Sequence, residues 1–323
     1  MGDIKTIGVL TSGGDAPGMN AVIRAVVRSG IYYGLKVKGV RHGYNGLIID
    51  DVIDMDLRSV SDIIQRGGTM LFTARCLEFE TEEGQQKAYE TCKKHGIDAL
   101  VVIGGDGSFR GCQAIAKKGI KCVGIPGTID NDISCSDYTI GFDTALNTAM
   151  EMIDRIRDTT QSHERCSLVE VMGRHSGYLA INTGIANGAM CILIPEKEYD
   201  IHQNVIAKMK ESQKEGKKNF LIIVAEGVGN VQEMSKIIQA ETGIETRATI
   251  LGHVQRGGSP SSRDRLLAAL MGCKAVELLK DGLYNRVVAL KEYKVVSYEI
   301  DEALKMKKSI DPEFLHVAEV VSI

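Results

Sequence analysis

Ala99-Leu-Val-Val-Ile-Gly-Gly-Asp-Gly-Ser108 is the stretch of sequence that decides the fold. Its first five residues, 99–103, are apolar without alternation, as expected for a strand that helices cover on both faces. A turn rich in glycine follows, and the spacing of apolar residues predicts a helix from Ser108 onward. Strand, glycine turn and helix in direct succession indicate a parallel sheet, because parallel strands need long crossover connections.

The same succession recurs on both sides of this stretch. Further short β-rich runs lie at 6–10, 36–40, 122–125, 167–171, 191–194, 220–225, 248–251 and 287–290. Helices are expected at 18–33, 82–95, 108–118, 144–157, 203–215 and 263–279, where apolar residues recur at three- and four-residue spacing. The chain of 323 residues also exceeds the usual size of a single core. The sequence therefore predicts an α/β protein with two lobes, each a mainly parallel sheet covered by helices.

The composition excludes several classes of protein. A content of 44% hydrophobic and 25% charged residues is typical of a globular chain, and the net charge of −3 speaks against a basic nucleic-acid binder. No apolar run is long enough for a membrane span or a signal peptide, so we expect neither a nucleic acid nor a membrane as partner. The eight cysteines form no C-x-x-C pair and favour a reducing compartment, so a cytoplasmic location is expected.

Two glycine turns directly follow expected strands and suit phosphate binding. The first, 11–20, is neither a P-loop nor a G-x-G-x-x-G fingerprint, yet its glycines let phosphate oxygens approach backbone N–H groups at a helix start. The second, 104–108, places Asp106 among glycines, which suits a Mg²⁺ held mainly by substrate phosphates and water. On its own, each turn is also compatible with a purely structural role.

A third turn, 124–132, carries Asp130 and Asp132 within three residues. In an extended segment these two side chains point to the same side. One of them could then take a proton from a hydroxyl while the other positions a metal or raises its partner's basicity, as phosphoryl transfer to an alcohol requires. The alternative is a surface turn rich in Asp and Asn.

Basic side chains follow several other expected strands. A fourth turn, 171–177, comes with the distant Arg165 and Arg247 and with the run 253–258. Arginines at several strand ends suit an anionic substrate, because a guanidinium pairs bidentately with phosphate oxygens. The glycine turn at 67–75 adds Arg75, which could neutralise charge during transfer. Individually, each of these residues could equally be a solvated surface cation or part of a structural loop.

Taken together and in this order, the segments resemble the bacterial ATP-dependent 6-phosphofructokinase family over essentially the full length. The motifs that carry the resemblance are G-V-L-T-S-G-G-D-A-P-G-M-N at 8–20, G-G-D-G-S at 104–108, P-G-T-I-D-N-D at 126–132, V-M-G-R at 171–174 and G-H-V-Q-R-G-G at 252–258. The resemblance implies the phosphofructokinase fold and phosphorylation of fructose 6-phosphate at its 1-hydroxyl in glycolysis.

The resemblance also implies specific site residues. It implies a catalytic group with Asp130 as general base, supported by Arg75, Thr128, Asp132 and Arg174. ATP would be bound by Gly14, Arg75, Cys76, Gly105, Asp106, Gly107 and Ser108, with Asp106 as the Mg²⁺ ligand. The sugar phosphate would be bound by Thr128, Ile129, Asp130, Arg165, Met172, Gly173, Arg174, Glu226, Arg247, His253, Val254, Gln255 and Arg256.

The family is a homotetramer, and the resemblance implies that Arg165 and Arg247 reach into the active site of a neighbouring subunit. It implies a larger ATP-binding lobe, 1–141 plus 255–304, and a smaller sugar-phosphate lobe, 142–254 plus 305–323. An effector site for ADP or phosphoenolpyruvate would be formed by Arg24, Arg28, Arg157, Gly188, Met190, Glu215, Lys217, Lys218 and Asn219. Met190 replaces an acidic residue of the family and Glu215 a basic one, so we predict a blunted or altered effector response.

Three alternatives stay open at this point. Pyrophosphate-using relatives carry Asp and Lys where this chain has Gly107 and Gly127, so the absence of these side chains favours ATP as donor. A catalytically silent regulatory subunit would normally have lost a residue such as Asp106 or Asp130. Another kinase with a G-G-D-G turn, acting on a dinucleotide or a lipid, would not need the sugar-phosphate arginines.

Overall fold

The computed structural model describes residues 4–322 and divides into two compact units. The first unit contains 1–129, 133–144 and 256–308, and the second contains 130–132, 145–255 and 309–323. The chain therefore passes between the units near residues 129, 132, 144, 255 and 308, whereas the sequence placed three crossings, near 141, 254 and 304.

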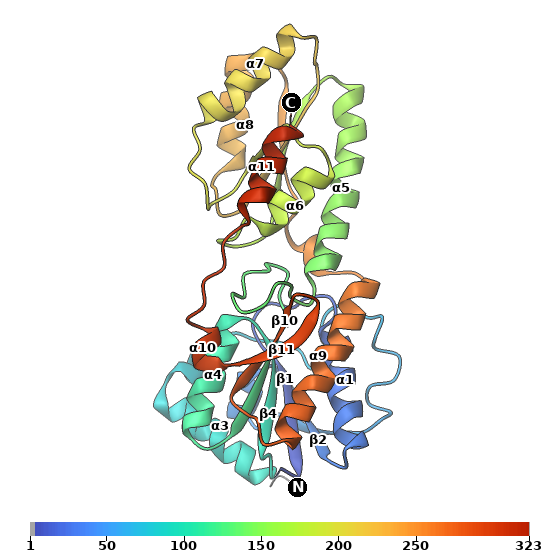
Figure 1. Ribbon diagram of the computed structural model, residues 1–323, viewed down its shortest axis with the longest axis vertical. Helices are drawn as coiled ribbons and strands as arrows, with labels where there is room; N and C mark the ends of the chain where they lie inside the picture. Colours follow the sequence, from blue (N-terminus) through green and yellow to red (C-terminus); the bar gives the residue numbers. More distant parts are fainter. Residues whose placement is uncertain (1–3, 323) are drawn as a thin grey trace. The chain divides into compact units, whose positions relative to one another are not determined.

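The first unit is built on a sheet of seven strands in the order β11-β10-β5-β4-β1-β2-β3 (Figure 1). All neighbours are parallel except the two outer pairs, β2 with β3 and β10 with β11. The strands are β1 (Thr6–Thr11), β2 (Lys36–Val40), β3 (Val52–Met55), β4 (Ala99–Gly104), β5 (Lys121–Pro126), β10 (Arg286–Lys291) and β11 (Lys294–Glu299).

Helices cover both faces of this sheet. Those of the first unit are α1 (Met19–Tyr32), α2 (Tyr44–Ile48), α3 (Glu82–Lys94), α4 (Asp106–Lys117), α9 (Ser262–Lys280) and α10 (Ile300–Ala303), with a short 3₁₀ turn, η1 (Glu78–Glu80). Helices α1 and α9 pack together on one face, and α3 and α4 lie on the other (Figure 1). The central strands β1 and β4 are therefore buried along their whole length, as the unbroken apolar run at 99–103 predicts.

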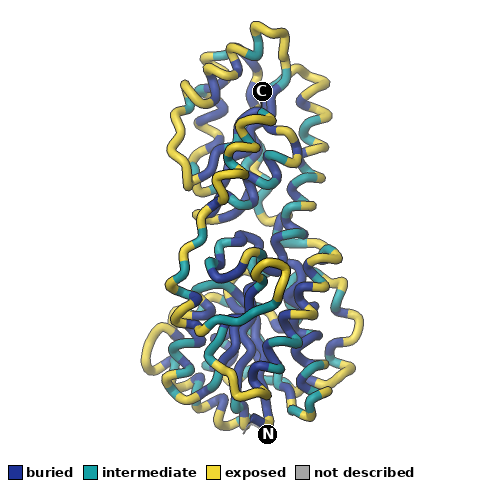
Figure 2. The backbone as a smooth tube through the Cα atoms, viewed as in Figure 1, coloured by how far each residue is buried: buried dark blue, intermediate teal, exposed yellow. Residues whose placement is uncertain are grey.

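The second unit contains a four-stranded, fully parallel sheet in the order β7-β8-β6-β9. Its strands are β6 (Cys166–Val171), β7 (Cys191–Leu193), β8 (Phe220–Ala225) and β9 (Thr246–Ile250). The prediction of an α/β fold with two mainly parallel sheets is thus confirmed. Figure 2 shows the buried residues gathered along the strands within each unit.

Helices also cover both faces of the second sheet. They are α5 (Phe142–Ser162), α6 (Tyr178–Ala186), α7 (Ala207–Lys214), α8 (Val231–Thr242) and α11 (Pro312–Val320), with one π-helical segment, η2 (Ile201–Ile206), and a 3₁₀ turn, η3 (Gly252–Arg256). Segment η2 runs directly into α7, and both pack with α8 on one face. Helices α5 and α6 lie on the other face, where Asn187 Nδ2 donates to Asp154 Oδ1 of α5.

A buried carboxylate fixes the first unit where the chain leaves it. Asp264 of α9 is fully buried and accepts hydrogen bonds from Gly141 N at 2.9 Å and from Thr144 N and Oγ1 at 2.9 and 2.5 Å. Burial raises the pKa of this carboxyl, although the same hydrogen bonds act in the opposite direction. The three hydrogen bonds to the Asp264 carboxylate hold the beginning of α5 against α9, and Ser261 Oγ accepts from Asp264 N as the N-cap of α9.

Candidate active site

The two glycine turns of the first unit lie side by side. Ser12 N donates to Ile103 O at 2.9 Å, and Ser108 Oγ donates to Ser12 O at 3.2 Å. A Cβ at Gly104 would lie only 2.5 Å from Ser12 O, so this position requires glycine. The expected ATP-binding turns at Gly14 and at Gly105–Ser108 are therefore neighbours at the carboxyl ends of β1 and β4, where ligands of open parallel sheets bind.

Asp106 is the first residue of α4 and is half-buried. The following residue, Gly107, is exposed and has open space where a Cβ would be. The Asp106 carboxylate fits a Mg²⁺ ion that is bound together with substrate phosphates. Such an ion takes one or two protein carboxylates and completes its coordination shell with phosphate and water oxygens. No group of three side chains able to hold a metal exists among residues 4–322.

The loop that carries Arg75 and Cys76 is tied to the first glycine turn and to α1 by hydrogen bonds. Asn20 Nδ2 donates to Gly67 O at 3.1 Å, and its Oδ1 accepts from Met70 N at 2.7 Å. Thr73 Oγ1 donates to Gly13 O at 2.7 Å. The loop is thereby fixed while Arg75 itself stays exposed, as an arginine that meets phosphate must be.

Arg256 lies beside the first glycine turn. Its Nη1 donates to Asp15 O at 3.0 Å, and a Cβ at Gly14 would lie 2.6 Å from the same nitrogen. The resemblance assigned this arginine to the sugar phosphate together with His253, Val254 and Gln255. The structure places Arg256 in the first unit with Gly14, whereas the three preceding residues belong to the second unit.

Gly127 has a packing role that the sequence did not reveal. A Cβ at this position would lie 2.9 Å from Ile103 Cγ2 and 3.4 Å from Met19 Cε. Its N–H donates to Gly104 O at 3.0 Å, which continues the pairing of β5 with β4. Packing around residue 127 therefore requires glycine there whatever the phosphoryl donor is. Gly107, which has open space around it, is the more informative of the two positions about the donor. Thr128 follows half-buried and Ile129 fully buried.

In the second unit, Asp130 is buried, with 3% of its surface exposed, and its backbone oxygen accepts from Ser176 Oγ at 3.1 Å. Asn131 adopts φ = 52°, in the left-handed region. The segment is therefore not extended, and the expectation that Asp130 and Asp132 share one side through strand alternation is wrong in its reasoning. Asp132 is half-buried.

A second turn in this unit forms a cradle from its backbone. The turn at Met172, Gly173 and Arg174 follows β6 and has φ = 140° at Gly173 and 56° at Arg174. Glu226, which follows β8, accepts from Gly173 N at 3.2 Å and from Arg174 N. Fully buried Gln255 accepts from Met172 N at 3.2 Å. These contacts bring together five residues that the sequence assigned to the sugar phosphate, and they leave the Arg174 side chain exposed. His253 and Val254 are exposed on η3.

Arg165 and Arg247 form a different cluster at the amino end of the same sheet. Arg165 Nε donates to Glu245 Oε2 at 2.7 Å, and Arg247 Nε donates to Glu245 Oε1 at 2.8 Å. The two guanidinium groups hold the pKa of the Glu245 carboxyl below its usual range. Glu245 was not among the expected site residues, because the strand expected here began only at 248; the structure begins β9 at Thr246, and the two-residue spacing of Glu245 and Arg247 places both side chains on one side.

These arginines lie far from the cradle. Arg165 precedes β6 and Met172 follows it, so the six residues of that strand separate the two clusters by roughly 20 Å at about 3.3 Å a residue. Within one chain, the second unit therefore does not bring Arg165 and Arg247 together with Arg174 and Glu226.

The residues assigned to an effector site have varied surroundings. Arg24 and Arg28 lie one turn apart on α1, and burial together with the charge of Arg28 lowers the pKa of Arg24. In the second unit, Arg157 donates to the backbone oxygens of Asn187 and Gly188 at the end of α6.

The remaining effector candidates are all in the second unit. Met190 is buried, with 3% exposed. Lys218 pairs with Glu164 at 2.8 Å, and Lys217 lies 5.9 Å from the Phe220 ring centroid. Glu215 ends α7 and is exposed, and Asn219 is half-buried. The thioether of Met190 offers no oxygen to a metal.

The adjacent glycine turns of the first unit and the cradle with the exposed Arg174 in the second unit both suit phosphate groups, and comparison with known proteins specifies the family. A family model described as "Phosphofructokinase" matches residues 6–279. The chain belongs to the phosphofructokinase family. A relative from Clostridium botulinum named ATP-dependent 6-phosphofructokinase is 56% identical over 319 residues, which cover 99% of this chain and 100% of the relative. A relative of the same name from Clostridioides difficile is also 56% identical, over 320 residues.

Solved structures are similar in fold. Phosphofructokinase from Pichia pastoris has a TM-score of 0.89 and 35% identity, and that from Saccharomyces cerevisiae has 0.87 and 37%. This chain spans only 40% and 48% of those two chains, respectively. A pyrophosphate-dependent phosphofructokinase from Marinobacter aquaeolei has a TM-score of 0.85 at 20% identity, which supports the fold alone. Among residues 4–322, no helix is long and apolar enough to cross a bilayer.

Proposed function

We propose that this chain transfers the terminal phosphoryl group of ATP to the 1-hydroxyl of fructose 6-phosphate, which yields fructose 1,6-bisphosphate and ADP. The observation that carries this conclusion is the 56% identity with curated ATP-dependent 6-phosphofructokinases across 99% of the chain. The chain is thus a kinase of glycolysis with an alcohol as acceptor. Its own geometry supports the roles assigned below to individual residues.

Asp130 acts as the general base. Its carboxylate accepts the proton of the 1-hydroxyl while that oxygen forms a bond to the γ-phosphorus and the bond from this phosphorus to the ADP oxygen breaks. Burial of Asp130 and the hydrogen bond from Ser176 to its backbone support this role, because a base must be held in place and shielded from water. Thr128 and Asp132 support the centre, and Arg75 and Arg174 neutralise the charge that develops on the phosphoryl oxygens.

ATP binds in the first unit, across the adjacent glycine turns. Gly105–Ser108 lies at the start of α4, where phosphate binds favourably, and Gly14 lies in the adjacent glycine turn that precedes α1. Asp106 holds Mg²⁺, which when bound neutralises phosphate charge during transfer. Cys76 follows Arg75 on the same loop, and its Sγ lies 3.9 Å from Asn45 Oδ1. The exposed, uncrowded position of Gly107 supports ATP rather than pyrophosphate as the donor.

Fructose 6-phosphate binds in the second unit, at the cradle formed by Met172, Gly173 and Arg174 with Glu226. Because Arg165 and Arg247 lie roughly 20 Å away at the other end of the sheet, we infer that they complete the phosphate site of a neighbouring copy. Exposed apolar side chains at the end of β9 and on η3, Ile250 at 53% and Val254 at 54%, support a protein contact of this unit. The active enzyme is then a homotetramer with shared active sites.

Regulation by ADP or phosphoenolpyruvate is proposed to be blunted or altered. Met190 supplies no carboxylate for an effector-bound metal, and Glu215 adds negative charge where the family has a basic residue. Arg157 is already engaged by two backbone oxygens. We further propose a cytoplasmic location, which is supported by eight cysteines that are all free thiols.

A coupled assay of fructose 1,6-bisphosphate formation tests the function directly. The full-length protein is assayed with Mg-ATP or with pyrophosphate, each with and without ADP and phosphoenolpyruvate. We expect turnover with ATP and a nearly flat response to both effectors. Turnover with pyrophosphate alone would overturn the assignment of the donor, and no turnover with either would indicate a catalytically silent subunit.

A further inference from the structure

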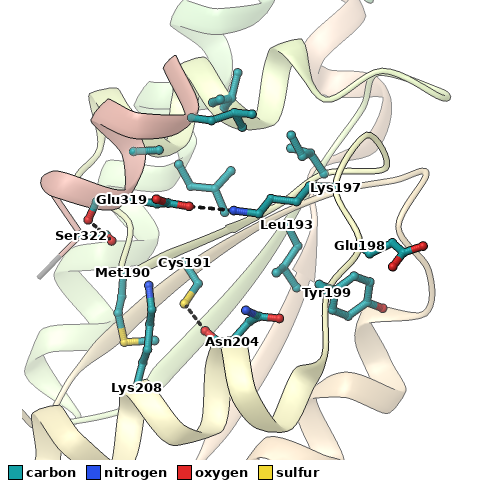
Figure 3. A pocket seen from close by; sticks show the side chains of 15 residues that line it. Met190, Cys191, Leu193, Lys197, Glu198, Tyr199, Asn204, Lys208, Glu319 and Ser322 are labelled. Atoms are coloured by element: carbon teal, nitrogen blue, oxygen red, sulfur yellow. Dashed lines mark hydrogen bonds and ion pairs between the residues drawn. The ribbon is translucent and has the colours of Figure 1, made fainter. Parts of the chain in front are cut away.

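The second unit contains a cavity that none of the assigned sites uses. Its volume is about 360 Å³, within the range of pockets that hold small organic ligands. Strand β7, helix α6, the continuous helical stretch of η2 and α7, and the C-terminal helix α11 enclose it (Figure 3). Of the residues assigned to ATP, sugar phosphate or effectors, Met190 alone lies in its wall.

Most of the cavity wall is apolar. Met190 and Leu193 come from the edge strand of the sheet and its approach, Ile181 from α6, and Leu315 and Ala318 from α11. Met190, Leu193 and Ile181 are buried, so these apolar surfaces are fixed by the core. Such a wall favours an occupant with a hydrocarbon body, because contact with it removes apolar surface from water.

One lysine of the cavity wall, Lys208, lacks a direct partner within residues 4–322. Lys197 pairs with Glu319 of α11 at 2.7 Å, which neutralises both groups. Within residues 4–322, Lys208 Nζ has neither an ion pair nor a hydrogen bond. Figure 3 shows this amine directed into the cavity beside Met190 and Cys191, while Glu198 points away from it. The lining contains two lysines and two glutamates, and within residues 4–322 Lys208 is the lysine of this pair without a direct partner, so its ammonium group can pair with a negative charge on an occupant.

A second donor lies next to Lys208. Asn204 and Lys208 are four residues apart on the helical stretch of η2 and α7, so their side chains are neighbours on one face. Cys191 Sγ donates to the backbone oxygen of Asn204 at 3.1 Å, which fixes this segment against β7. Burial raises the pKa of the Cys191 thiol to about 11, so this group stays neutral at physiological pH and leaves Lys208 to an external anion.

We propose that this cavity binds a small amphipathic monocarboxylate. Its hydrocarbon body lies against Met190, Leu193 and Ala318, and its carboxylate accepts hydrogen bonds from Lys208 Nζ and the side-chain amide of Asn204. The site is separate from the proposed catalytic residues, and its occupancy does not depend on the proposed phosphoryl transfer. Because α11 forms one wall and holds the Lys197–Glu319 ion pair, binding also stabilises the docking of the C-terminal helix.

Octanoate is the probe, titrated into the full-length protein by calorimetry, with 1-octanol and inorganic phosphate as comparison ligands. For octanoate we expect saturable binding with a Kd on the order of 0.1–1 mM, given the modest affinity per atom of small ligands. Lys208→Gln should weaken binding about tenfold through loss of the charge-assisted hydrogen bond. Lys214→Gln, an exposed position on the same helix, is the matched control and should bind like the wild type.

A second variant tests the position of the hydrocarbon body. Ala318→Phe fills the cavity from α11 and should abolish octanoate binding, with unchanged circular dichroism showing that the fold is kept. If this variant fails to fold, the comparison of Lys208→Gln with Lys214→Gln still decides the matter. Equal affinity for 1-octanol, equal affinity for phosphate, equal effects of the two lysine variants, or no saturable binding would each overturn the proposal. A change of oligomeric mass in Lys208→Gln without a change in affinity would indicate that a second copy of the chain fills this region instead.

Discussion

The two ends of the four-stranded sheet in the second unit differ in the surroundings that they give to glutamate side chains. At the carboxyl end, Glu226 is held by backbone N–H groups, and burial and the nearby Glu226 charge raise the pKa of Glu170. At the amino end, Arg165 and Arg247 lower the pKa of Glu245. The pKa of a glutamate is thus raised at one end of this small sheet and lowered at the other.

This difference indicates two kinds of binding surface. The carboxyl end uses backbone geometry and buried polar groups to shape a cradle, which is typical of the site where chemistry is done. The amino end presents the exposed Arg247, at 64% exposure, beside the more buried Arg165 at 20%, and such guanidinium groups can neutralise charge on another molecule. The first end should therefore control turnover, and the second should control affinity for the sugar phosphate.

The largest effect is expected from Asp130→Asn, which removes the proposed base next to the cradle. Turnover should fall by roughly 10²–10⁴-fold while the KM for fructose 6-phosphate changes little. Steady-state kinetics with Mg-ATP measure both values. Asp132→Asn, two residues away, is the matched variant and should cost less; the reverse order, or near-normal turnover of Asp130→Asn, would exclude Asp130 as the base.

The double variant Arg165→Ala, Arg247→Ala should raise the KM for fructose 6-phosphate by about 10-fold to 100-fold or more, since each loses a charge-assisted contact to phosphate. Turnover at saturation should change much less. Lys218→Ala, which removes a nearby exposed cation paired with Glu164, is the control and should leave this KM unchanged.

Co-expression distinguishes shared sites from sites within one chain. If Arg165 and Arg247 serve a neighbour, mixed oligomers of the double arginine variant and Asp130→Asn should regain activity, because some sites then receive an intact Asp130 from one chain and intact arginines from another. Purification through a different tag on each chain isolates these oligomers. Activity no higher than that of the two parents would contradict the shared-site proposal.

Glu245→Gln should raise the same KM only severalfold, since it removes the carboxylate that aligns both arginines but keeps their charge. It should also change the response of stability to acid. The folded-state pKa of Glu245 lies below the ordinary value of 4.5, so its ion pairs stabilise the fold above pH 4.5 and this contribution is lost as the pH falls through the folded value. Thermal unfolding midpoints measured from pH 7 downward should converge for the two proteins in acid. Parallel curves would contradict the role given to Glu245.

The sequence predicted the buried strands of the fold, but it did not reveal two exposed edge strands. All nine expected strands are present, because apolar runs of four to six residues between helices are an unambiguous pattern for parallel strands. The two missed strands, β3 and β11, are both antiparallel edge strands with charged residues at their exposed positions. Helix α6 was missed because it is apolar on most sides and lacks a polar face.

The parts of the candidate site that form local motifs could be predicted from the sequence. Contacts between residues far apart in the chain could not. The turns around Gly105 and Met172 could be identified from strand ends and glycine spacing. The tie between Asn20 and the Arg75 loop joins residues about 50 positions apart in the chain, and no local pattern signals it. The left-handed Asn131 reverses a conclusion from simple alternation, because one residue with φ = 52° redirects the side chain that follows it.

The smallest effect is expected at the carboxyl end, from Glu170→Gln. Burial, and secondarily the charge of Glu226, raises the pKa of Glu170 above its ordinary value of 4.5, so its ionised form costs stability at pH 7 and this cost disappears below pH 4.5. Glutamine removes the charge, so the variant should be more stable at pH 7 by ~0.5 kcal/mol, a small value because the half-exposed side chain is screened by solvent. The gain should vanish in acid. Glu211→Gln, exposed on α7, is the control and should show no such pH-dependent gain. Equal stability of wild type and Glu170→Gln at pH 7 would remove the electrostatic contrast between the two ends of the sheet, whereas a gain confined to neutral pH would agree with a Glu170 carboxylate that is destabilised by burial and, secondarily, by the charge of Glu226.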